Sequence, residues 1–299
     1  MMQVIWKDRD ITGLVLSVVV EHAAETAGRE ARVQALYAPA DERFACLNPT
    51  CGDAVTVKTA DAELFAGMVE RVDWDSDGMH LELVCLEPSA LLAKNEVYRA
   101  FSGTPKAIAT ELCRLCALPV GSLWDKPGKV FLPPTGARSL FSLLREAYGG
   151  DCITESRAGA LVVRPMDERV WIPDNEGVRS LRAAHSCENA VTGAGVVSAQ
   201  GKTLASVTRP EWEAVFGPRR RVYSLVGAQS GAKAQALAHL TGMARTGQLE
   251  LPGDAALRCG DTVRLDLGQY GLRGDYRIGW VAHRLEAGDF TTTLGVTGT

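Results

Sequence analysis

The sequence has no apolar run long enough to cross a membrane. The longest such run near the N-terminus is Leu14–Val20, whereas a membrane-spanning helix needs about twenty residues. Its valine-rich composition instead predicts a buried strand. Met1–Lys7 is followed by Asp8, Arg9 and Asp10, and these charges interrupt the apolar segment that a signal peptide requires. We therefore expect a protein made in the cytoplasm, with no membrane partner.

An excess of positive charge is also missing. The 32 Lys and Arg residues are outnumbered by 36 Asp and Glu residues, and the net charge is −4. A phosphate-binding surface usually makes its domain basic, so we expect no specific binding of nucleic acid. The one dense basic cluster is Arg219–Arg221. We interpret it as a solvated turn or a subunit contact, with a nucleic-acid contact as the alternative.

Cysteine is not scarce, but disulfides are not expected. The chain has 299 residues, enough for two or three domains that need no covalent staples. Because no secretion signal is visible, we predict reduced, buried thiols. The eight cysteines are Cys46, Cys51, Cys85, Cys113, Cys116, Cys152, Cys187 and Cys259.

A phosphate-binding loop is not expected either. Gly195–Thr203, which includes Lys202, has five residues between its glycines where four are needed. No good helix follows Thr203, and the N-terminus of such a helix is what holds the phosphate. The segment is predicted to be a strand, a turn and a strand.

Metal sites are excluded by similar mismatches. Asp73–Gly78 has the opening carboxylates of a calcium loop, but Val84 stands where the bidentate Glu belongs. We expect a solvated hairpin tip there. Cys113 and Cys116 are a lone pair without a second pair at zinc-site spacing, so buried structural thiols are favoured.

Nucleophilic catalysis finds no support in the sequence. Gly227–Gly231 is not a nucleophile elbow because its serine comes one place too late. The five histidines are scattered along the chain, at His22, His80, His185, His239 and His283. Of these, His80 and His283 fall on expected barrel strands, where we predict that they face outward. No catalytic, cofactor-binding or metal-binding residue is assigned, no cofactor is expected, and the chain is predicted not to be an enzyme. A hydrolase or nucleotide-dependent enzyme using Lys202, Cys113 or Cys116 is the alternative.

Residues 1–100 are predicted to be all-β and to form a first small barrel. Several segments alternate between apolar and polar side chains between turn signals, and others are rich in branched residues. The expected strands are Val15–Val20, Arg32–Tyr37, Ala54–Thr59, Leu64–Asp73 and Met79–Leu86.

Residues 101–175 predict a small α/β module. Thr104 suits a helix N-cap, with Pro105 at the first helical position and Pro119 after the end. The other expected elements are a helix at Ser139–Tyr148, stopped by Gly149 and Gly150, and a hairpin of Cys152–Glu155 with Ala160–Arg164.

Residues 176–299 predict a second β-barrel with a helical insertion near 228–246. The expected elements are strands at Asn189–Ser198, Leu204–Thr208, Gln248–Leu251, Thr262–Leu267, Tyr276–Glu286 and Phe290–Val296, and a helix at Lys233–Ala244. The fold class is therefore mainly β with an α+β insertion: two small barrels flanking an α/β module.

An internal repeat connects the two ends of the chain. Cys51–Val57 reappears as Cys259–Leu265, and Gly67–Val72 aligns with Gly279–Arg284. A turn containing glycine follows in both copies, and then a closing strand, His80–Cys85 or Thr291–Val296. Chance is the alternative, because Gly-Asp before a strand is common. Several elements matching in order favour a duplicated barrel.

Together these segments resemble the baseplate hub family of contractile phage tails and phage-tail-like particles. The resemblance covers nearly the whole chain but involves few invariant residues. It is carried by Cys51–Val57, Leu64–Val69, Leu83–Leu86, Phe101–Ile108, Ser142–Tyr148, Ala160–Val163, Trp212–Gly217, Tyr223, Lys233–Ala244, Gly260–Leu267 and Tyr276–His283. The numerous cysteines depart from the family pattern and have no assigned role. No cell-wall hydrolase or protease domain is appended, so any lytic activity is expected in a partner.

The resemblance implies a structural role in a virion or phage-tail-like particle. Such hubs are homotrimers whose two barrels per chain form a ring with quasi-sixfold symmetry. The ring adapts a hexameric tail tube to a trimeric central spike. The expected partners are other copies of the chain, tube or tube-initiator proteins and the spike, with the tape-measure protein and baseplate wedge as further candidates. A hub-like module of a host-attachment protein from a non-contractile tail is the alternative.

Overall fold

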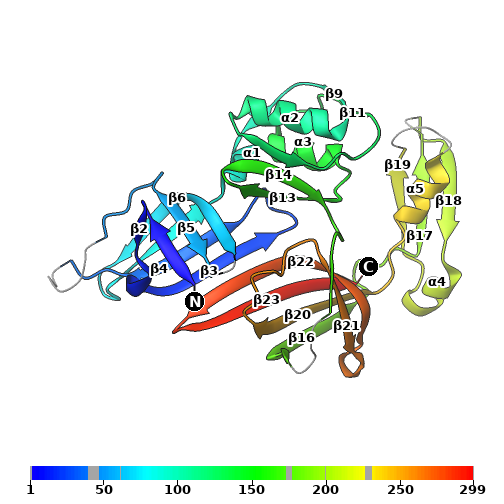
Figure 1. The fold of residues 1–299 in the computed structure, drawn as a ribbon. Coiled ribbons are helices and arrows are strands. Elements are labelled where there is room, and N and C mark those ends of the chain that lie inside the picture. The colour runs from blue at the N-terminus through cyan, green and yellow to red at the C-terminus, as the bar shows by residue number, and fades with distance from the viewer. Residues whose placement is uncertain are drawn as a thin grey trace.

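The structure is a computed structural model that describes residues 2–39, 47–60, 62–172, 177–198, 200–225 and 231–298. Within these residues, 13 strands form one large sheet that joins the two ends of the chain. Figure 1 shows its N-terminal strands in blue and cyan and its C-terminal strands in orange and red. A green α/β module lies above the sheet, and a small yellow-green unit lies to one side.

The large sheet follows a single path from one free edge to the other. Its order is β16 (Ser180–Ser186), β20 (Ala244–Pro252), β23 (Asp289–Gly298), β22 (Leu272–Glu286), β3 (Val15–Ala23), β4 (Glu30–Leu36), β7 (His80–Leu86), β6 (Glu63–Asp75), β5 (Ala54–Lys58), β1 (Gln3–Trp6) and β2 (Arg9–Asp10). Off this path, β21 (Thr262–Leu267) pairs with β22 and with β15 (Val170–Trp171).

The internal repeat is visible as two runs of strands in the same order. The first half reads β3-β4-β7-β6-β5-β1, and the second reads β16-β20-β23-β22-β21-β15. The last strand differs in direction, since β1 is antiparallel to β5 whereas β15 is parallel to β21. The mainly-β class is confirmed, and each β unit is a curled half-barrel that shares its sheet with the other.

Backbone hydrogen bonds fix which residues of the two halves are equivalent. Val69 N donates to Asp53 O and Val69 O accepts from Gly52 N, at 2.8 and 2.7 Å. Ile278 makes the same two bonds to Asp261 and Gly260, also at 2.8 and 2.7 Å. Val69 is therefore equivalent to Ile278.

The alignment of Gly67 with Gly279 is thus wrong by three positions, because the structure places Gly67 opposite Val55 and Tyr276 opposite the equivalent Val263. The closing strands are in register as predicted, and both long strands shift register just after Val69 and Ile278.

One strand joins the two halves. The first part of β22 pairs with β21, and its second part, Trp280–Glu286, pairs with β3 along Ser17–Ala23. The other edge of β22 pairs with β23. The second half-barrel therefore continues into the first without a break in hydrogen bonding.

The α/β module packs against the junction of the two half-barrels, on the face from which His22 of β3 contacts Thr154 of the module. It holds α1 (Leu91–Lys94), α2 (Pro105–Leu115), α3 (Leu140–Ala147), β8 (Glu96–Val97), β9 (Phe101–Gly103), β10 (Val120–Leu123), β11 (Val130–Leu132), β12 (Arg138–Ser139), β13 (Cys152–Arg157) and β14 (Ala160–Pro165). The predicted N-cap is confirmed, because Thr104 Oγ1 accepts from Ala107 N at 3.2 Å. Ser139 caps α3 in the same way, with its Oγ accepting from Ser142 N at 3.1 Å.

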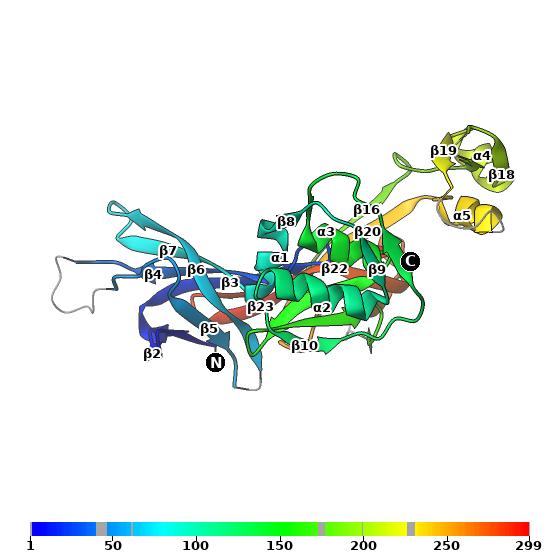
Figure 2. The same ribbon diagram turned by 90° about the horizontal axis from the view of Figure 1, so that it is seen from above.

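The small unit is inserted between two neighbouring strands of the second half-barrel. It contains β17 (Gly193–Val197), β18 (Thr203–Thr208), β19 (Arg220–Ser224), α4 (Pro210–Phe216) and α5 (Ala232–Ala238). Figure 2 shows it projecting from one end of the molecule. The strands expected from Asn189 onward form this separate three-stranded sheet and do not complete the second barrel.

Two further expectations are wrong in this region. The helix predicted at Lys233–Ala244 ends at Ala238, because Ala244 already pairs with Ser186 in the large sheet. The strand Ser180–Ser186, which completes the second half-barrel, was not anticipated.

In the part of the chain that the structure describes, four apolar cores support these parts. One lies in each half-barrel, one lies in the α/β module, and a small one lies in the inserted unit around Ala194, Val196, Ala232 and Ala236. The cores of the half-barrels use alternate residues of each strand, which leaves the other face of the sheet polar. Among the described residues, no helix has the length and apolar character needed to span a membrane.

Candidate functional site

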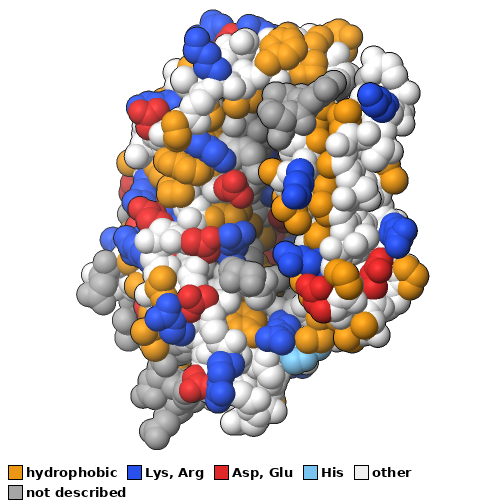
Figure 3. Space-filling view, turned by 90° about the vertical axis from the view of Figure 1, so that its right-hand side faces the viewer, with side chains coloured by type: hydrophobic (Ala, Val, Ile, Leu, Met, Phe, Trp, Pro, Cys, Tyr) orange, Lys and Arg blue, Asp and Glu red, His pale blue; other side chains and the backbone are white. Residues whose placement is uncertain are grey.

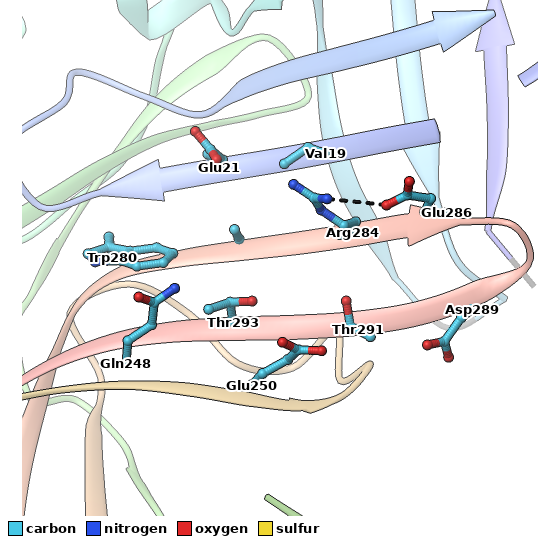
Figure 4. A pocket seen from close by; sticks show the side chains of 11 residues that line it. Val19, Glu21, Gln248, Glu250, Trp280, Arg284, Glu286, Asp289, Thr291 and Thr293 are labelled. Atoms are coloured by element: carbon cyan, nitrogen blue, oxygen red, sulfur yellow. Dashed lines mark hydrogen bonds and ion pairs between the residues drawn. The ribbon is translucent and has the colours of Figure 1, made fainter. Parts of the chain in front are cut away.

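A groove lies on the polar face of the large sheet, at the junction of the two half-barrels. It has a volume of about 570 Å³ and is formed by β3, β22, β23 and β20. Figure 4 shows the side chains rising from these neighbouring strands toward the same space. Its lining residues are Val19, Glu21, Gln248, Glu250, Trp280, Ala282, Arg284, Glu286, Asp289, Thr291 and Thr293.

Strand periodicity explains why this face is polar. On β22, Ala282, Arg284 and Glu286 line the groove, while Val281 and His283 are buried on the other face. Successive side chains of a strand point to opposite faces, so a sequence that alternates in this way gives one wet and one dry side. The groove crosses the junction between the two half-barrels, because β3 belongs to the first and β22 to the second.

The groove carries an excess of carboxylates. Glu21, Glu250, Glu286 and Asp289 line it, with Arg284 as the guanidinium among the lining residues. Arg284 Nη1 lies 3.2 Å from Glu286 Oε2. The hydrogen bond from Arg179 lowers the pKa of Asp289, so that side chain stays ionised. An acidic surface of this kind repels anions, and it shows no nucleophile beside a base.

Behind the junction, a buried ionic cluster attaches the α/β module to the sheet. Arg29 Nε lies 2.9 Å from Glu87 Oε1, and Arg29 Nη2 lies 3.2 Å from Glu155 Oε2. Glu155 also contacts Arg157 at 2.6 Å and Arg258 at 3.5 Å. These residues come from both half-barrels and the module. Removing one partner of such a cluster would leave buried charge unpaired, so its role is to fix the three parts together.

The pKa values of the two buried carboxyls move in opposite directions. Burial raises the pKa of Glu87 more than Arg29 lowers it. Burial also acts to raise the pKa of Glu155, but Arg29, Arg157 and Arg258 outweigh it and the pKa is lowered. Each carboxyl contacts an arginine of this chain, as expected for a structural cluster. Glu87 Oε2 accepts from Arg29 N and Ser156 N, whereas Glu87 Oε1 faces Arg29 Nε without a hydrogen bond.

Two histidines lie in the same buried region, one from each half-barrel. His22 Nε2–H donates to Thr154 O at 2.9 Å, and His283 Nδ1 lies 3.1 Å from Thr292 Oγ1. Burial lowers the pKa of each to about 4. The prediction that His283 faces outward is wrong, because the register of β22 turns it toward the core.

The aspartates of the repeated Cys-Gly-Asp turns have equivalent structural roles in the two halves. Asp53 accepts from Trp6 Nε1 at 3.0 Å and pairs with Lys7 at 2.7 Å. Asp261 pairs with the buried Arg164 at 3.0 Å. Each carboxylate therefore anchors a neighbouring segment to its turn. The repeat pointed to these residues, but their partners could not be found from sequence spacing.

The thiols do not form a metal site within the described residues. Burial raises the pKa of Cys113 to about 11 and also raises the pKa of Cys116, so neither is a ready nucleophile. The described cysteines are free. Cys51 is exposed, against the prediction of buried thiols, and Cys46 lies outside the described residues.

The remaining sequence candidates are structural. The segment around Lys202 is a β17–β18 hairpin, as predicted. Asp75 Oδ1 accepts from Asp77 N and Gly78 N at 3.0 and 2.8 Å, which confirms a hairpin tip there. The serine of Gly227–Gly231 lies outside the described residues.

The basic cluster of the inserted unit is largely occupied by contacts within that unit. Arg219 donates to Phe216 O at 3.1 Å and to Cys187 O. Arg220 lies 3.4 Å from Glu213. Figure 3 shows the face on this side of the molecule, where Lys and Arg side chains are interspersed with Asp and Glu. This arrangement favours neither a phosphate surface nor a catalytic site.

No protein-family model matches this sequence, and no curated protein matches it. Solved structures do share its fold. The 43 kDa tail protein of prophage MuSo2 from Shewanella oneidensis aligns with a TM-score of 0.78 at 14% identity, over 99% of this chain and 97% of that one. A tail protein from Neisseria meningitidis MC58 aligns with a TM-score of 0.69 at 12% identity, over 99% and 96%.

A third match comes from a secretion machine. The Escherichia coli c3393 protein aligns with a TM-score of 0.53 at 13% identity, over 94% of this chain and 73% of that one. It is described as a component of the type VI secretion system with structural similarity to the T4 tail proteins gp27 and gp5. The two half-barrels, the module and the inserted unit thus make up the fold that this chain shares with phage tail proteins.

Proposed function

We propose that this chain is the structural baseplate hub of a contractile phage-type tail. Three copies form a ring with quasi-sixfold symmetry, which adapts a hexameric tail tube to a trimeric central spike. Each chain contributes two half-barrels, so three chains supply six similar positions. The three-part division into 1–100, 101–175 and 176–299 remains a proposal of the same kind.

The duplicated half-barrel carries this proposal. Strands run in the same order in both halves, and one continuous sheet holds the halves in a fixed relation. A symmetry adaptor needs such a duplication, because the sixfold partner meets six similar surfaces while the threefold partner meets three chains. The inserted unit follows β16 in the second half only. A ring of three chains would therefore carry three such units, and this difference between the halves gives the ring its threefold rather than sixfold symmetry.

The structural neighbours support the same assignment. One is a prophage tail protein, the second is a tail protein from Neisseria meningitidis, and the third is a secretion-system component likened to T4 tail proteins. The proposed partners are other copies of this chain, tube or tube-initiator proteins and the spike, in the baseplate of a virion or tail-like particle. The role is mechanical, with no catalytic step.

The acidic groove fits the channel side of this ring. Its carboxylates, including Glu21 and Glu250, lie on the face opposite the apolar cores. A lining of this sign repels phosphate, so a nucleic acid could pass without adhering. The proposal therefore accommodates both the acidic composition and the absence of an expected nucleic-acid site.

The deciding experiment is the mass of the purified protein in solution, alone and with candidate tube and spike proteins. Light scattering coupled to gel filtration should give three chain masses, and electron microscopy should show a ring. A chain that stays monomeric at high concentration and binds neither partner would overturn the proposal.

A further inference from the structure

The long strand of the first half-barrel has an unpaired edge. The first part of β6 pairs with β5, and its other edge pairs with β7. Along the edge that β5 occupies, the described strands leave Arg71–Asp75 without a partner. Trp74 in this segment is 55% exposed. An open edge with an exposed tryptophan is a template for pairing with another strand.

The equivalent segment of the second half-barrel is paired. Val69 and Ile278 are equivalent, and both strands shift register just after them. The segment equivalent to Arg71–Asp75 is therefore Trp280–Arg284, which pairs with β3. The chain thus shows what this edge binds: the first strand of the neighbouring half-barrel.

The counterpart of β3 also has a free edge. Ser17 and Val18 pair with Gln34 and Val33 of β4, and Ser180 and Leu181 pair with the equivalent Glu250 and Leu249 of β20. Strand β16 is therefore the second copy of β3. It ends the path of the sheet, and six of its seven residues are exposed.

We propose that β16 of one copy of this chain pairs antiparallel with Arg71–Asp75 of β6 in the next copy. This joint between chains repeats the β22–β3 joint within each chain. The inference rests on the proposed ring and specifies the contact that closes it. Six strands, β20, β23, β22, β3, β4 and β7, lie between β16 and β6 in the sheet, so the two free edges are not neighbours within one chain.

The internal joint also fixes the register. Within the chain, Ala282 lies opposite Glu21 and Arg284 lies opposite Val19. The equivalent pairs between chains are Asp73 with Ala184 and Asp75 with Arg182. The second pair sets a carboxylate opposite a guanidinium, and Arg182 has no ion pair among the described residues. Opposite charges on facing strands favour the pairing.

Cysteine cross-linking tests this register. The variant carries Asp73→Cys and Ala184→Cys, with Cys46 and Cys51 replaced by serine. Under mild oxidation with copper phenanthroline, we expect covalent dimers and trimers at least tenfold more abundant than in either single-cysteine variant. The bands should stop at three chains, because the ring is closed.

Two matched controls define the specificity. Glu21→Cys with Ala282→Cys places the same pair at the internal joint, and it should give a disulfide within one chain and no covalent oligomer. Asp73→Cys with Ser180→Cys moves one partner four residues along β16, and it should cross-link no more than the single-cysteine variants do. Hydrogen exchange of the unsubstituted protein is an independent measurement: the amides of Arg71–Asp75 should become protected as concentration drives assembly.

The outcomes separate this inference from the proposed function. A protein that is trimeric by light scattering but shows neither the cross-link nor the protection overturns the strand joint and leaves the hub proposal standing. A protein that stays monomeric with tube and spike proteins overturns both. A ladder of bands beyond three chains supports the joint and contradicts the closed ring.

Discussion

At the residue scale, the two buried histidines make the junction sensitive to acid. His22 and His283 are both neutral in the fold because burial lowers the pKa of each to about 4. The groups around His22 are Arg29 and Arg164, which disfavour its protonation, and Glu155, which favours it. In the unfolded chain each imidazole titrates near pH 6.5.

Acidification below pH 6.5 should therefore destabilise the protein. Between pH 6.5 and about 4 the unfolded chain binds protons at these sites and the folded chain does not, so stability falls as pH falls. At pH 5 the loss is about 2 kcal/mol for each histidine. The measurement is denaturant unfolding at pH 7.5 and pH 5, compared with His22→Gln and His283→Gln.

Each substitution should shrink the difference between the two pH values. His80→Gln is the control, since that side chain is 25% exposed beside Asp75, and it should keep the full difference. An equal pH dependence in all variants would contradict the assignment of acid sensitivity to the junction.

The repeated turn offers a second prediction, because its two glycines differ in surroundings. Gly52 and Gly260 have φ of +92° and +83°. A Cβ on Gly52 would meet nothing within 4 Å, whereas one on Gly260 would lie 2.3 Å from Ile153 Cγ1. Gly52→Ala should cost about 1 kcal/mol from backbone strain, and Gly260→Ala should cost about 2–4 kcal/mol because overpacking is added.

Urea unfolding of the two alanine variants, under identical conditions, measures this contrast. Equal losses would show that the turn at Gly260 relaxes away from Ile153.

At the scale of elements, the helix caps of the module are local features whose contribution to the free energy of unfolding can be predicted. Thr104 Oγ1 satisfies Ala107 N at the start of α2. Thr104→Ala should cost about 1 kcal/mol. Thr110, whose hydroxyl donates to Lys106 O within the same helix, is the matched control, and Thr110→Ala should change stability by less than about 0.5 kcal/mol. Thermal unfolding followed by circular dichroism provides the comparison.

Elements with a strong local signal were predictable from the sequence. The strands of the first half-barrel, the capped helices and the closing strands of the repeat have clear periodicity or capping residues. Strand β16, with sequence Ser-Leu-Arg-Ala-Ala-His-Ser, has no apolar alternation, because six of its residues are exposed. Its partner β20 begins at Ala244, in a segment with good helix propensity that pairing in the sheet overrides.

Long-range features of the site were out of reach for a related reason. The acidic groove is assembled from strands that lie far apart in the sequence, such as β3 and β22. The junction cluster joins Arg29 to Glu155, which are 126 residues apart in the sequence. The irregularity after Ile278 resets the facing of β22, which is why His283 was assigned to the wrong side.

At the scale of the whole molecule, both half-barrels belong to one continuous sheet. Two separate barrels would meet through side chains and could reorient, whereas β22 and β3 share backbone hydrogen bonds along Trp280–Glu286. The ionic cluster behind this joint then locks the module onto both halves. The geometry of one joint is thus rigid, as required if the same joint is to be repeated between chains.

The inserted unit stands apart from this frame, and its removal makes a whole-molecule prediction. Ser186 and Ala244 are direct partners across β16 and β20, so residues 187–243 occupy the position of a hairpin turn. The unit has its own small core. A groove of about 810 Å³, lined by Trp212 and Phe216 on one side and Arg245 and Tyr276 on the other, separates it from the half-barrel.

Replacing residues 187–243 by Asn-Gly should therefore leave the large sheet folded. This dipeptide suits a two-residue hairpin turn that matches strand twist. Because few packed contacts are lost, the melting temperature should fall by less than about 5 °C, which corresponds to roughly 1–2 kcal/mol for a chain of this size. A matched variant that keeps the unit but carries Ser186→Pro should lose more, since proline blocks a ladder bond in β16. Loss of cooperative unfolding in the shortened chain would instead show that the unit is part of the second half-barrel's core.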